Sequence, residues 1–354
     1  MAFVISDLGS RTSNRPGRLS KSENLFVGTE DEQGSDWAIV LAGGSGERMR
    51  ASISNWMGTY KPKQFCAFVG TRTMLDHTWD RALQLVGSDR IVTVAVTEHR
   101  CYFEQMGRRV PGTLIFQPEK IGTAAAVYLA LAYILALDHR ANIILMPSDH
   151  FIYPESRFVE LAEQSLATAR RYPQQIVLLG AEATWANSDY GWIESHLSIT
   201  EHSGEDPVST LMQVDGFIEK PRMSEATRLF CQGALWSTMI VAARAKSLWI
   251  QAQVQQPEFF ACLLQIRRLL SQARLGKFSM QALDKALKQI FLRMPILDFS
   301  RDLLQGCSNQ CLVLPMTALA WDDWGRPERI LRCIEQYGLD PNSRTISRTT
   351  NHCH

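Results

Sequence analysis

The chain has 354 residues, of which 45% are hydrophobic and 21% are charged, and its formal net charge is +1. This composition is typical of a globular protein with one large α/β domain, or with a main domain and a smaller one. It argues against a nucleic-acid-binding protein with a broad basic surface, and no apolar run is long enough for a membrane span.

The cysteines indicate a reducing compartment. No two of the eight form a C-x-x-C pair, and the chain has neither a disulfide framework nor a secretory signal. We therefore expect a cytoplasmic protein.

Three regions follow from composition along the chain. Residues 1–35 are rich in Ser, Arg, Gly, Asn and Glu without periodicity, so we predict a disordered tail there. Residues 36–340 are predicted to form one domain, with a largely helical section at 246–293, and residues 341–354 a second tail.

The first half of the domain alternates two kinds of pattern. Apolar, β-branched runs predict buried strands at 37–42, 90–96, 113–116, 142–146 and 176–180. Helical spacing predicts helices near 74–86, 123–137 and 155–171. This order predicts a doubly wound, mostly parallel α/β sheet, in which ligands bind outside the carboxyl ends of the strands.

The second half is less regular. Strands with polar ends are predicted at 190–194, 214–221, 236–243 and 311–315. A closing helix is predicted at 326–337, with Pro327 in its first turn.

A glycine-rich turn follows the first predicted strand and indicates a phosphate site. Gly43, Gly44 and Gly46 allow a positive φ and close approach of backbone N–H groups to a ligand. Arg48 and Lys63 follow, and such cations suit a triphosphate. A tight strand exit with two solvated cations would give the same pattern.

Two carboxylates could hold Mg²⁺. Asp149 ends a wholly apolar strand, and Asp323 lies in an acidic and aromatic turn far along the chain, with Asp322 as its competitor. Magnesium takes one or two carboxylates together with substrate phosphates. A capping role for Asp149 is the alternative interpretation.

Glu219 and Lys220 end another predicted strand as an acid and a base. Glutamate accepts hydrogen bonds from sugar hydroxyls, and lysine pairs with a sugar phosphate. As an isolated tripeptide, Glu-Lys-Pro is also an ordinary strand end.

These motifs together resemble a known family. LAGGSGERM followed by KPKQF resembles the signature of the sugar-nucleotide pyrophosphorylases, and in particular of the mannose-1-phosphate guanylyltransferases. The resemblance continues, in order, through FQPEKIGTAAAV, LMPSDHFI, DYGWIE, VDGFIEKP, LWSTMIVAAR and WDDWGRPERIL. It covers roughly residues 37–335 and implies a Rossmann-like, doubly wound mixed sheet of the nucleotide-diphospho-sugar transferase type.

The resemblance implies transfer of a nucleotidyl group from an NTP to a sugar 1-phosphate, with Mg²⁺ as cofactor and small molecules as the partners. Arg48 and Lys63 would be catalytic, and Asp149 and Asp323 would hold the metal. The nucleotide would be bound by residues of two loops: Leu41, Ala42, Gly43, Gly44, Ser45, Gly46, Gln117, Gly122 and Thr123. The sugar phosphate would be bound by Tyr190, Gly191, Glu219, Lys220 and Ser237. His150 is expected to support Asp149 rather than to act as a base.

Three departures from the family pattern bear on function. Ser237 stands where the family usually has asparagine, Glu47 where threonine is commoner, and Gln117 where an acid is frequent. The chain is also expected to lack the isomerase-type domain of the long bifunctional members.

Several readings stay open. A uridylyl- or thymidylyltransferase acting on glucose 1-phosphate and a non-catalytic nucleotide-sugar-binding protein are the alternatives. The sequence leaves a homo-oligomer open, and it predicts neither a nucleic-acid nor a membrane partner.

Overall fold

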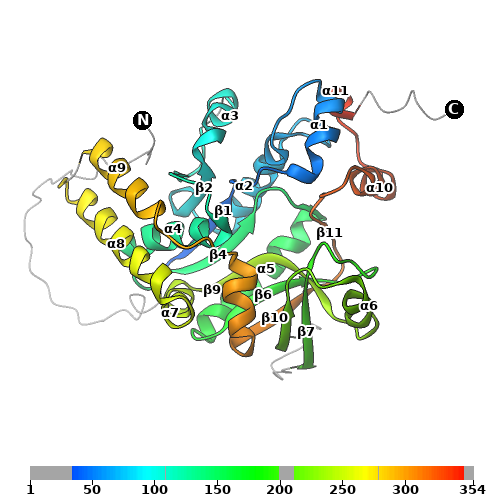
Figure 1. Cartoon of the computed structure of the whole chain (residues 1–354). Helices are drawn as coiled ribbons and strands as arrows, with labels where there is room; N and C mark the ends of the chain where they lie inside the picture. Colours follow the sequence, from blue (N-terminus) through cyan, green and yellow to red (C-terminus); the bar gives the residue numbers. More distant parts are fainter. Residues whose placement is uncertain (1–33, 108, 199–210, 278, 347–354) are drawn as a thin grey trace, which may run out of the picture.

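A twisted central sheet with helices on both faces organises the molecule (Figure 1). The computed structural model describes residues 34–107, 109–198, 211–277 and 279–346. Within them, nine strands form the main sheet in the order β3-β2-β1-β4-β9-β6-β10-β8-β7, and β5 and β11 form a separate pair. The strands are β1 Asp36–Leu41, β2 Ile91–Val96, β3 Thr113–Gln117, β4 Asn142–Pro147, β5 Phe151–Tyr153, β6 Ile176–Ala181, β7 Gly191–Ser198, β8 Met212–Ile218, β9 Leu235–Arg244, β10 Cys311–Met316 and β11 Ala320–Asp322.

The sheet has two parts of different direction. Strands β3, β2, β1 and β4 are parallel neighbours, as the alternating pattern predicts. Strand β9 then runs antiparallel between β4 and β6, and β8 and β7 continue antiparallel beyond β10. The predicted doubly wound mixed sheet is therefore confirmed, and its parallel part brings the ends of β1, β3 and β4 to one edge.

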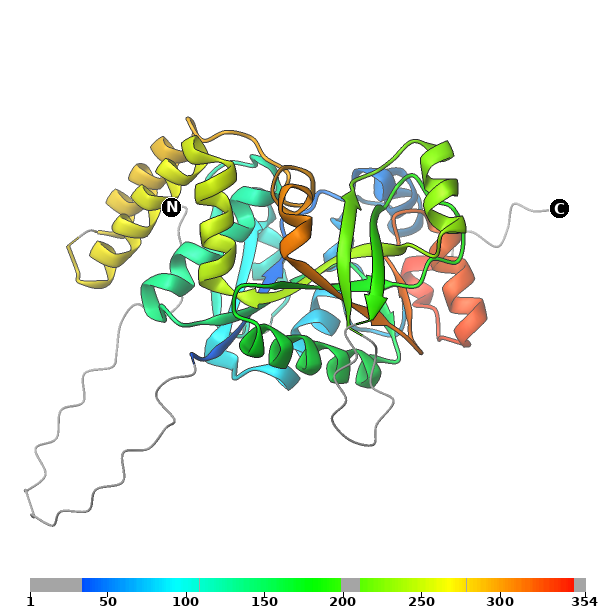
Figure 2. The same ribbon diagram turned by 90° about the horizontal axis from the view of Figure 1, so that it is seen from below.

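The helices lie in two layers over the sheet (Figures 1 and 2). One apolar core joins the sheet to α4, α7, α8 and α9, and a second joins its other face to α2 and α5. The α-helices are α1 Arg50–Met57, α2 Met74–Leu85, α3 Arg100–Gln105, α4 Gly122–Leu137, α5 Glu155–Arg171, α6 Met223–Cys231, α7 Ala245–Gln255, α8 Pro257–Arg274, α9 Met280–Phe291, α10 Pro327–Tyr337 and α11 Ser343–Ile346. The shorter helical turns are η2 Glu47–Met49, η3 Lys63–Phe65, η4 Ser88–Arg90, η5 Thr97–His99, η6 Ser300–Leu304 and η7 Gln305–Gln310.

The central strands contribute side chains to both apolar cores, because successive side chains of a strand point to opposite faces of the sheet. Ile39 of β1 lies in the core with α4, whereas Ala38 and Val40 lie in the core with α2 and α5. Helix α4 is apolar on nearly every side and is buried, as expected for a helix covered by both the sheet and α8. None of the described helices is both long and apolar enough to cross a membrane.

A third, smaller core lies beside the sheet, where α1, α10 and α11 pack. The prediction that residues 341–354 form a tail is wrong for 341–346. Pro341 pairs with Val69, Asn342 donates to Gly70 O at 2.6 Å, and Ile346 is buried in this core. These long-range contacts are invisible in local composition. Residues 347–354, and all but the last two residues of the predicted tail 1–35, lie outside the described residues.

Short elements and strand ends depart most from expectation. Helices α1, α3 and α6 and strands β5 and β11 were not predicted, because each is short and takes its stability from packing. The strand predicted at 214–221 ends at Ile218, so Glu219 and Lys220 lie beyond it. Lys220 has a φ of 49°, a left-handed conformation that does not continue a strand.

Candidate active site

The glycine-rich turn leaves the sheet at its centre. Leu41 O accepts from Ser148 N and Ala42 N donates to Val94 O, so the chain stays paired with both neighbouring strands up to the turn. Gly46 has a φ of 59°, and a Cβ there would lie 3.4 Å from Lys63 Cβ. Glycine at position 46 therefore serves both the backbone conformation and the approach of Lys63.

The carbonyl oxygens of the turn are bound from one side. Gln64 Nε2 donates to Ala42 O at 2.9 Å and to Gly44 O at 3.0 Å, and the Tyr60 hydroxyl donates to Ser45 O. A trans peptide directs its C=O and N–H to opposite sides, so the N–H groups after these carbonyls face the other way. These N–H groups belong to Gly43, Ser45 and Gly46. No described residue supplies them with an acceptor. Such an array of N–H groups is a binding site for an anion.

Lys63 connects the turn to two distant carboxylates. Its side chain is only 5% exposed, and Nζ lies 2.9 Å from Asp149 Oδ2 while it also donates to the main-chain oxygen of Asp323. Burial acts to raise the pKa of Asp149, but the charge and hydrogen bond of Lys63, together with His150 and Arg48, hold that pKa below its ordinary value. Asp149 is therefore an ionised carboxylate, and the sequence-predicted residues Lys63, Asp149 and Asp323 do meet.

His150 is a neutral neighbour. Burial lowers the pKa of His150 to about 4, and its Nδ1 accepts a hydrogen bond from Trp321 Nε1 at 3.3 Å. This arrangement agrees with the expected supporting role and leaves the imidazole a poor base at neutral pH.

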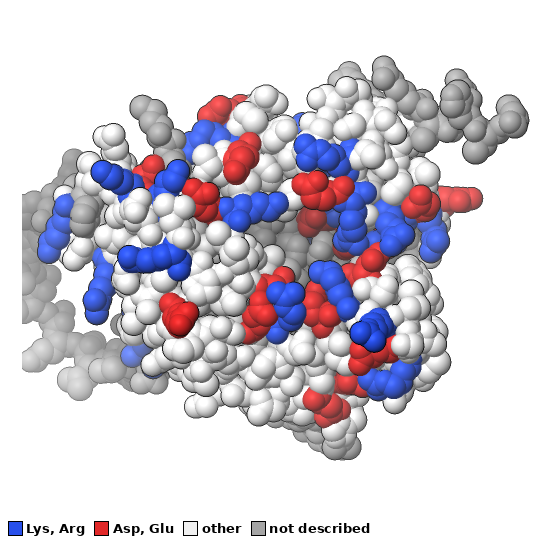
Figure 3. Space-filling view, viewed as in Figure 1, with Lys and Arg blue, Asp and Glu red and all other residues white. Residues whose placement is uncertain are grey.

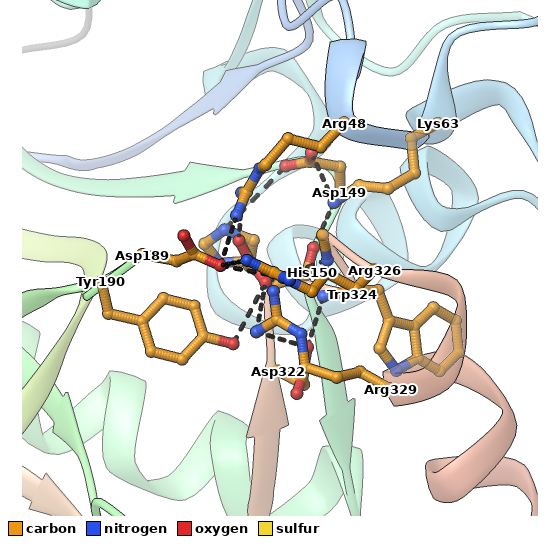
Figure 4. Close-up of polar contacts among 12 residues, drawn as sticks. Arg48, Lys63, Asp149, His150, Asp189, Tyr190, Asp322, Trp324, Arg326 and Arg329 are labelled. Atoms are coloured by element: carbon orange, nitrogen blue, oxygen red, sulfur yellow. Dashed lines mark hydrogen bonds and ion pairs between the residues drawn. The ribbon is translucent and has the colours of Figure 1, made fainter. Parts of the chain in front are cut away.

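Asp323, rather than its neighbour Asp322, accepts from both Arg48 and Tyr190. The side chains of Arg48 and Tyr190 point toward the same centre (Figure 4). Asp323 Oδ1 accepts from Tyr190 OH at 3.1 Å and Gly325 N at 3.0 Å and lies 3.0 Å from Arg329 NH1. Asp322 instead accepts from Trp324 N at 2.6 Å, and burial and the charge of Asp323 raise the pKa of Asp322 to about 7. Three contacts fix one oxygen of Asp323 and direct the other toward the crevice.

Arg48 reaches that second oxygen. Its NH2 lies 2.6 Å from Asp323 Oδ2, and its NH1 lies 3.6 Å from Asp189, which also pairs with Arg326 at 2.9 Å. Acidic and basic side chains are interleaved across this face of the molecule rather than gathered in one basic patch (Figure 3). The cations Arg48 and Arg326 thus each have a carboxylate partner in the site.

Glu47, one of the departures from the family pattern, points away from this cluster. Its side chain is 63% exposed and pairs with Arg50 at 3.5 Å. An acid at this position therefore does not oppose an anion bound at the turn.

The end of β3 forms the facing wall. Gln117 is 3% exposed, and its Nε2 has no hydrogen-bond partner among the described residues. A Cβ on Gly43 would lie 3.6 Å from Gln117 Oε1, so this amide borders the turn. An unpaired buried donor costs about 1–3 kcal/mol, which a ligand acceptor would offset.

Gly122 and Thr123 pack against the segment that follows α9. A Cβ on Gly122, whose φ is 86°, would lie 2.3 Å from Leu297 O. The Thr123 hydroxyl donates to Asp298 Oδ2 at 3.2 Å and accepts from Phe299 N at 2.8 Å. The segment after α9 thus holds the start of α4, and this packing explains the glycine at 122.

The predicted sugar-phosphate residues lie on β7 and β9 and at the ends of β7 and β8. A Cβ on Gly191 would lie 2.6 Å from Glu219 Oε2 and 3.2 Å from Ser237 Cβ, so these three residues meet. Burial raises the pKa of Glu219, which the Lys220 ammonium at 3.0 Å only partly offsets. The Tyr190 hydroxyl does not join this group, because it donates to Asp323 Oδ1.

The donor set fits Mg²⁺. Asp149 and Asp323 are oxygen ligands brought to one ammonium group, and the described residues contain no cluster of three His, Cys, Asp or Glu of the kind that encloses a transition metal. Two carboxylates with further oxygens from water and phosphates are what Mg²⁺ prefers.

Sequence reasoning missed four charged residues of the site: Lys120, Asp189, Arg326 and Arg329. All four lie inside the motifs FQPEKIGTAAAV, DYGWIE and WDDWGRPERIL, so the motifs marked the region. Which side chain turns inward depends on the tertiary path, and no sequence spacing gives it.

Comparisons with known proteins agree with this geometry. The model of the Nucleotidyl transferase family matches residues 37–338. A mannose-1-phosphate guanylyltransferase of Salmonella montevideo is 28% identical over 64% of this chain and 46% of its own length. The xanthan biosynthesis protein XanB of Xanthomonas campestris is 30% identical over 62% of this chain and 44% of its own length. The chain thus spans about half the length of these relatives.

A solved structure supports the fold. The Thermus thermophilus protein titled mannose-1-phosphate geranyltransferase superposes with a TM-score of 0.67 at 22% identity, over 84% of this chain and 79% of that one. The predicted resemblance to nucleotide-sugar transferases is confirmed at the level of family and fold.

Proposed function

Since this chain belongs to the nucleotidyl transferase family, we propose that it transfers a nucleotidyl group from an NTP to a sugar 1-phosphate, releasing pyrophosphate. The observation that carries this proposal is the outward-facing N–H array of Gly43, Ser45 and Gly46 beside the Lys63–Asp149 pair. An anion site next to an ammonium and a metal-type carboxylate suits a triphosphate and its magnesium.

The residues divide the work by position. The turn holds the triphosphate through its N–H groups, and Lys63 offsets the charge at the phosphorus under attack. Arg48 exchanges Asp323 for a phosphate oxygen when substrate arrives. The sugar phosphate is itself an anionic nucleophile, so the protein aligns two anions and lowers their repulsion without a general base.

Asp149 and Asp323 would hold Mg²⁺, which supplies positive charge to the phosphate oxygens. Lys63 and Arg48 are the cations that pair with these two carboxylates.

GTP and mannose 1-phosphate are the proposed substrates. The named relatives support this choice, as do the KPKQF and WDDWG motifs. The product would be GDP-mannose, which suits a cytoplasmic enzyme that serves polysaccharide biosynthesis. We propose no nucleic-acid or membrane partner, and self-association remains compatible with this function.

Another base and sugar form the main alternative, because Gln117 presents an amide where an acid is frequent and Ser237 is shorter than asparagine. A non-catalytic nucleotide-sugar-binding protein is the second alternative. Ser237 favours it, whereas the pairing of Glu47 with Arg50 removes one reason for it.

The test is a panel of each NTP against mannose 1-phosphate and glucose 1-phosphate, with Mg²⁺ and continuous detection of pyrophosphate. We expect the fastest release with GTP and mannose 1-phosphate, and an Asp149→Asn control without release. Faster turnover of another pair would move the assignment to that pair. Tight binding of GTP or GDP-mannose with no release from any pair would favour the binding protein.

A further inference from the structure

Lys120 lies on the loop between β3 and α4 and reaches across to the glycine-rich turn. Its Nζ donates to Ser45 Oγ at 2.8 Å. The Ser45 hydroxyl therefore accepts a hydrogen bond from an ammonium group, while the Ser45 carbonyl oxygen accepts one from the Tyr60 hydroxyl. Lys120 lies inside the motif FQPEKIGTAAAV, but the resemblance gave it no role.

Each cation of the neighbouring cluster already has a carboxyl partner. Its four cationic side chains face four carboxyl groups, all within 4.0 Å of a partner: Arg48, Lys63, Arg326 and Arg329 against Asp149, Asp189, Asp322 and Asp323. A polyanion that enters such a cluster needs positive charge that the carboxylates do not already hold.

Lys120 is a cation of this kind. In the described part of the chain no carboxylate lies within ion-pair distance of its ammonium. The adjacent acid, Glu119, pairs with Lys288 of α9 at 3.4 Å. The charge of Lys120 is therefore free to act on a ligand at the turn.

The loop that carries Lys120 is also held in place. Leu297 O accepts from Ala124 N at 3.2 Å and closely approaches Gly122, and Asp298 binds the Thr123 hydroxyl. The backbone that carries Lys120 is therefore held by β3 before it and by these contacts after it.

We propose that Lys120 binds the terminal phosphates of the NTP, as the cation that closes the triphosphate site from the β3 side. This role rests on the proposed function and adds a residue to it. Lys63, tied to Asp149 and Asp323, would serve the reacting phosphorus, whereas Lys120 at Ser45 would serve the phosphates that leave as pyrophosphate.

Isothermal titration in the absence of sugar phosphate tests this role. GTP, UTP and dTTP with Mg²⁺, and the matching monophosphates, are titrated into the wild type, Lys120→Met and Lys120→Arg. Lys285→Met, an equal loss of charge at an exposed position on α9, is the matched control. Because Lys120 is exposed, the substitutions should leave the melting temperature unchanged.

We expect Lys120→Met to bind the triphosphate about tenfold more weakly while monophosphate affinity changes less than about twofold, since the charge-assisted hydrogen bond is lost only where the terminal phosphates are present. Lys120→Arg should keep most of the affinity, and Lys285→Met all of it. Unchanged triphosphate binding in Lys120→Met, or an equal loss for both ligands, would overturn the assignment of Lys120 alone. A wild type that binds none of the three triphosphates would overturn it together with the proposed function.

Discussion

In the proposed function, the two halves of the crevice recognise their ligands by different means. In the proposed nucleotide half, main-chain N–H groups of a glycine-rich turn between parallel strands would face the ligand. In the proposed sugar half, the side chains would be those of Glu219 and Lys220, just beyond β8, and of Ser237 on the antiparallel strand β9.

Residues with a positive φ occur in both halves. At the glycine-rich turn the positive φ falls on Gly46, where it costs little, and beside Asp323 it falls on Trp324, whose φ is 44°. In the sugar half it falls on Lys220 and Met239, and the register of β9 against β6 shifts opposite Ser237. Strain at non-glycine residues persists where the surrounding structure enforces it.

This difference predicts which half tolerates change. Main-chain recognition of phosphates depends little on side-chain identity, so it suits any NTP. Side-chain recognition changes with one substitution, so the choice of sugar should be set by few residues. Ser237 is the residue at which this chain departs from the family there.

The largest expected effect comes from Lys63, which joins the glycine-rich turn to Asp149 and Asp323. Lys63→Met should lower kcat about 10³-fold, because it removes preorganised charge at the reacting phosphorus. Steady-state kinetics of pyrophosphate release measures it, with Lys285→Met as the control for charge and circular dichroism as the control for folding. A loss of less than tenfold in a folded variant would remove Lys63 from the chemical step.

A smaller effect, confined to one half, is expected at Glu219. Glu219→Gln should raise the KM for the sugar phosphate about tenfold and leave the KM for the NTP unchanged, because the carboxylate faces Gly191 and Ser237 and not the turn. Equal changes in both KM values would break the division into two halves.

The smallest effect is a difference in how the stability of the protein depends on pH. At Glu155, the first residue of α5, burial acts to raise the pKa, but His77 and Arg81 lower it below its ordinary value. Burial raises the pKa of Glu219, with Lys220 and Arg301 opposing and Asp298 adding to the rise. The two carboxyls should therefore affect stability with opposite signs around their ordinary pKa of 4.5.

Urea unfolding between pH 3.5 and 7 measures this contrast. Relative to Glu155→Gln, the wild type should lose stability as pH falls below 4.5, because the carboxylate that His77 and Arg81 stabilise becomes protonated. Relative to Glu219→Gln, the wild type should lose stability as pH rises above 4.5, because ionisation of a buried carboxyl is unfavourable. Each difference is on the order of 1 kcal/mol. Differences of the same sign would refute the contrast.

Sequence reasoning succeeded where a signal is local. The strand and glycine turn at 37–46 and the helix at 155–171 were predicted almost to the residue, because their hydrophobic period and turn residues leave few alternatives. The same strand ends placed Asp149 correctly beside Lys63.

It failed where a role depends on long-range packing. Three contacts between distant segments show this: Tyr190 binds Asp323, Gly122 packs on Leu297, and Lys120 donates to Ser45. The choice between Asp322 and Asp323 is similar, since adjacent residues differ only in which side of β11 and its turn they face.

The central claim is that the two halves form one site for a single transfer reaction. Phosphorus NMR of the protein with GTP, mannose 1-phosphate and Mg²⁺ tests it most directly. The account predicts GDP-mannose and pyrophosphate appearing in equal amounts as both substrates disappear. Hydrolysis of GTP without formation of a sugar nucleotide, or two unchanged substrates for this and every other NTP and sugar phosphate, would contradict it.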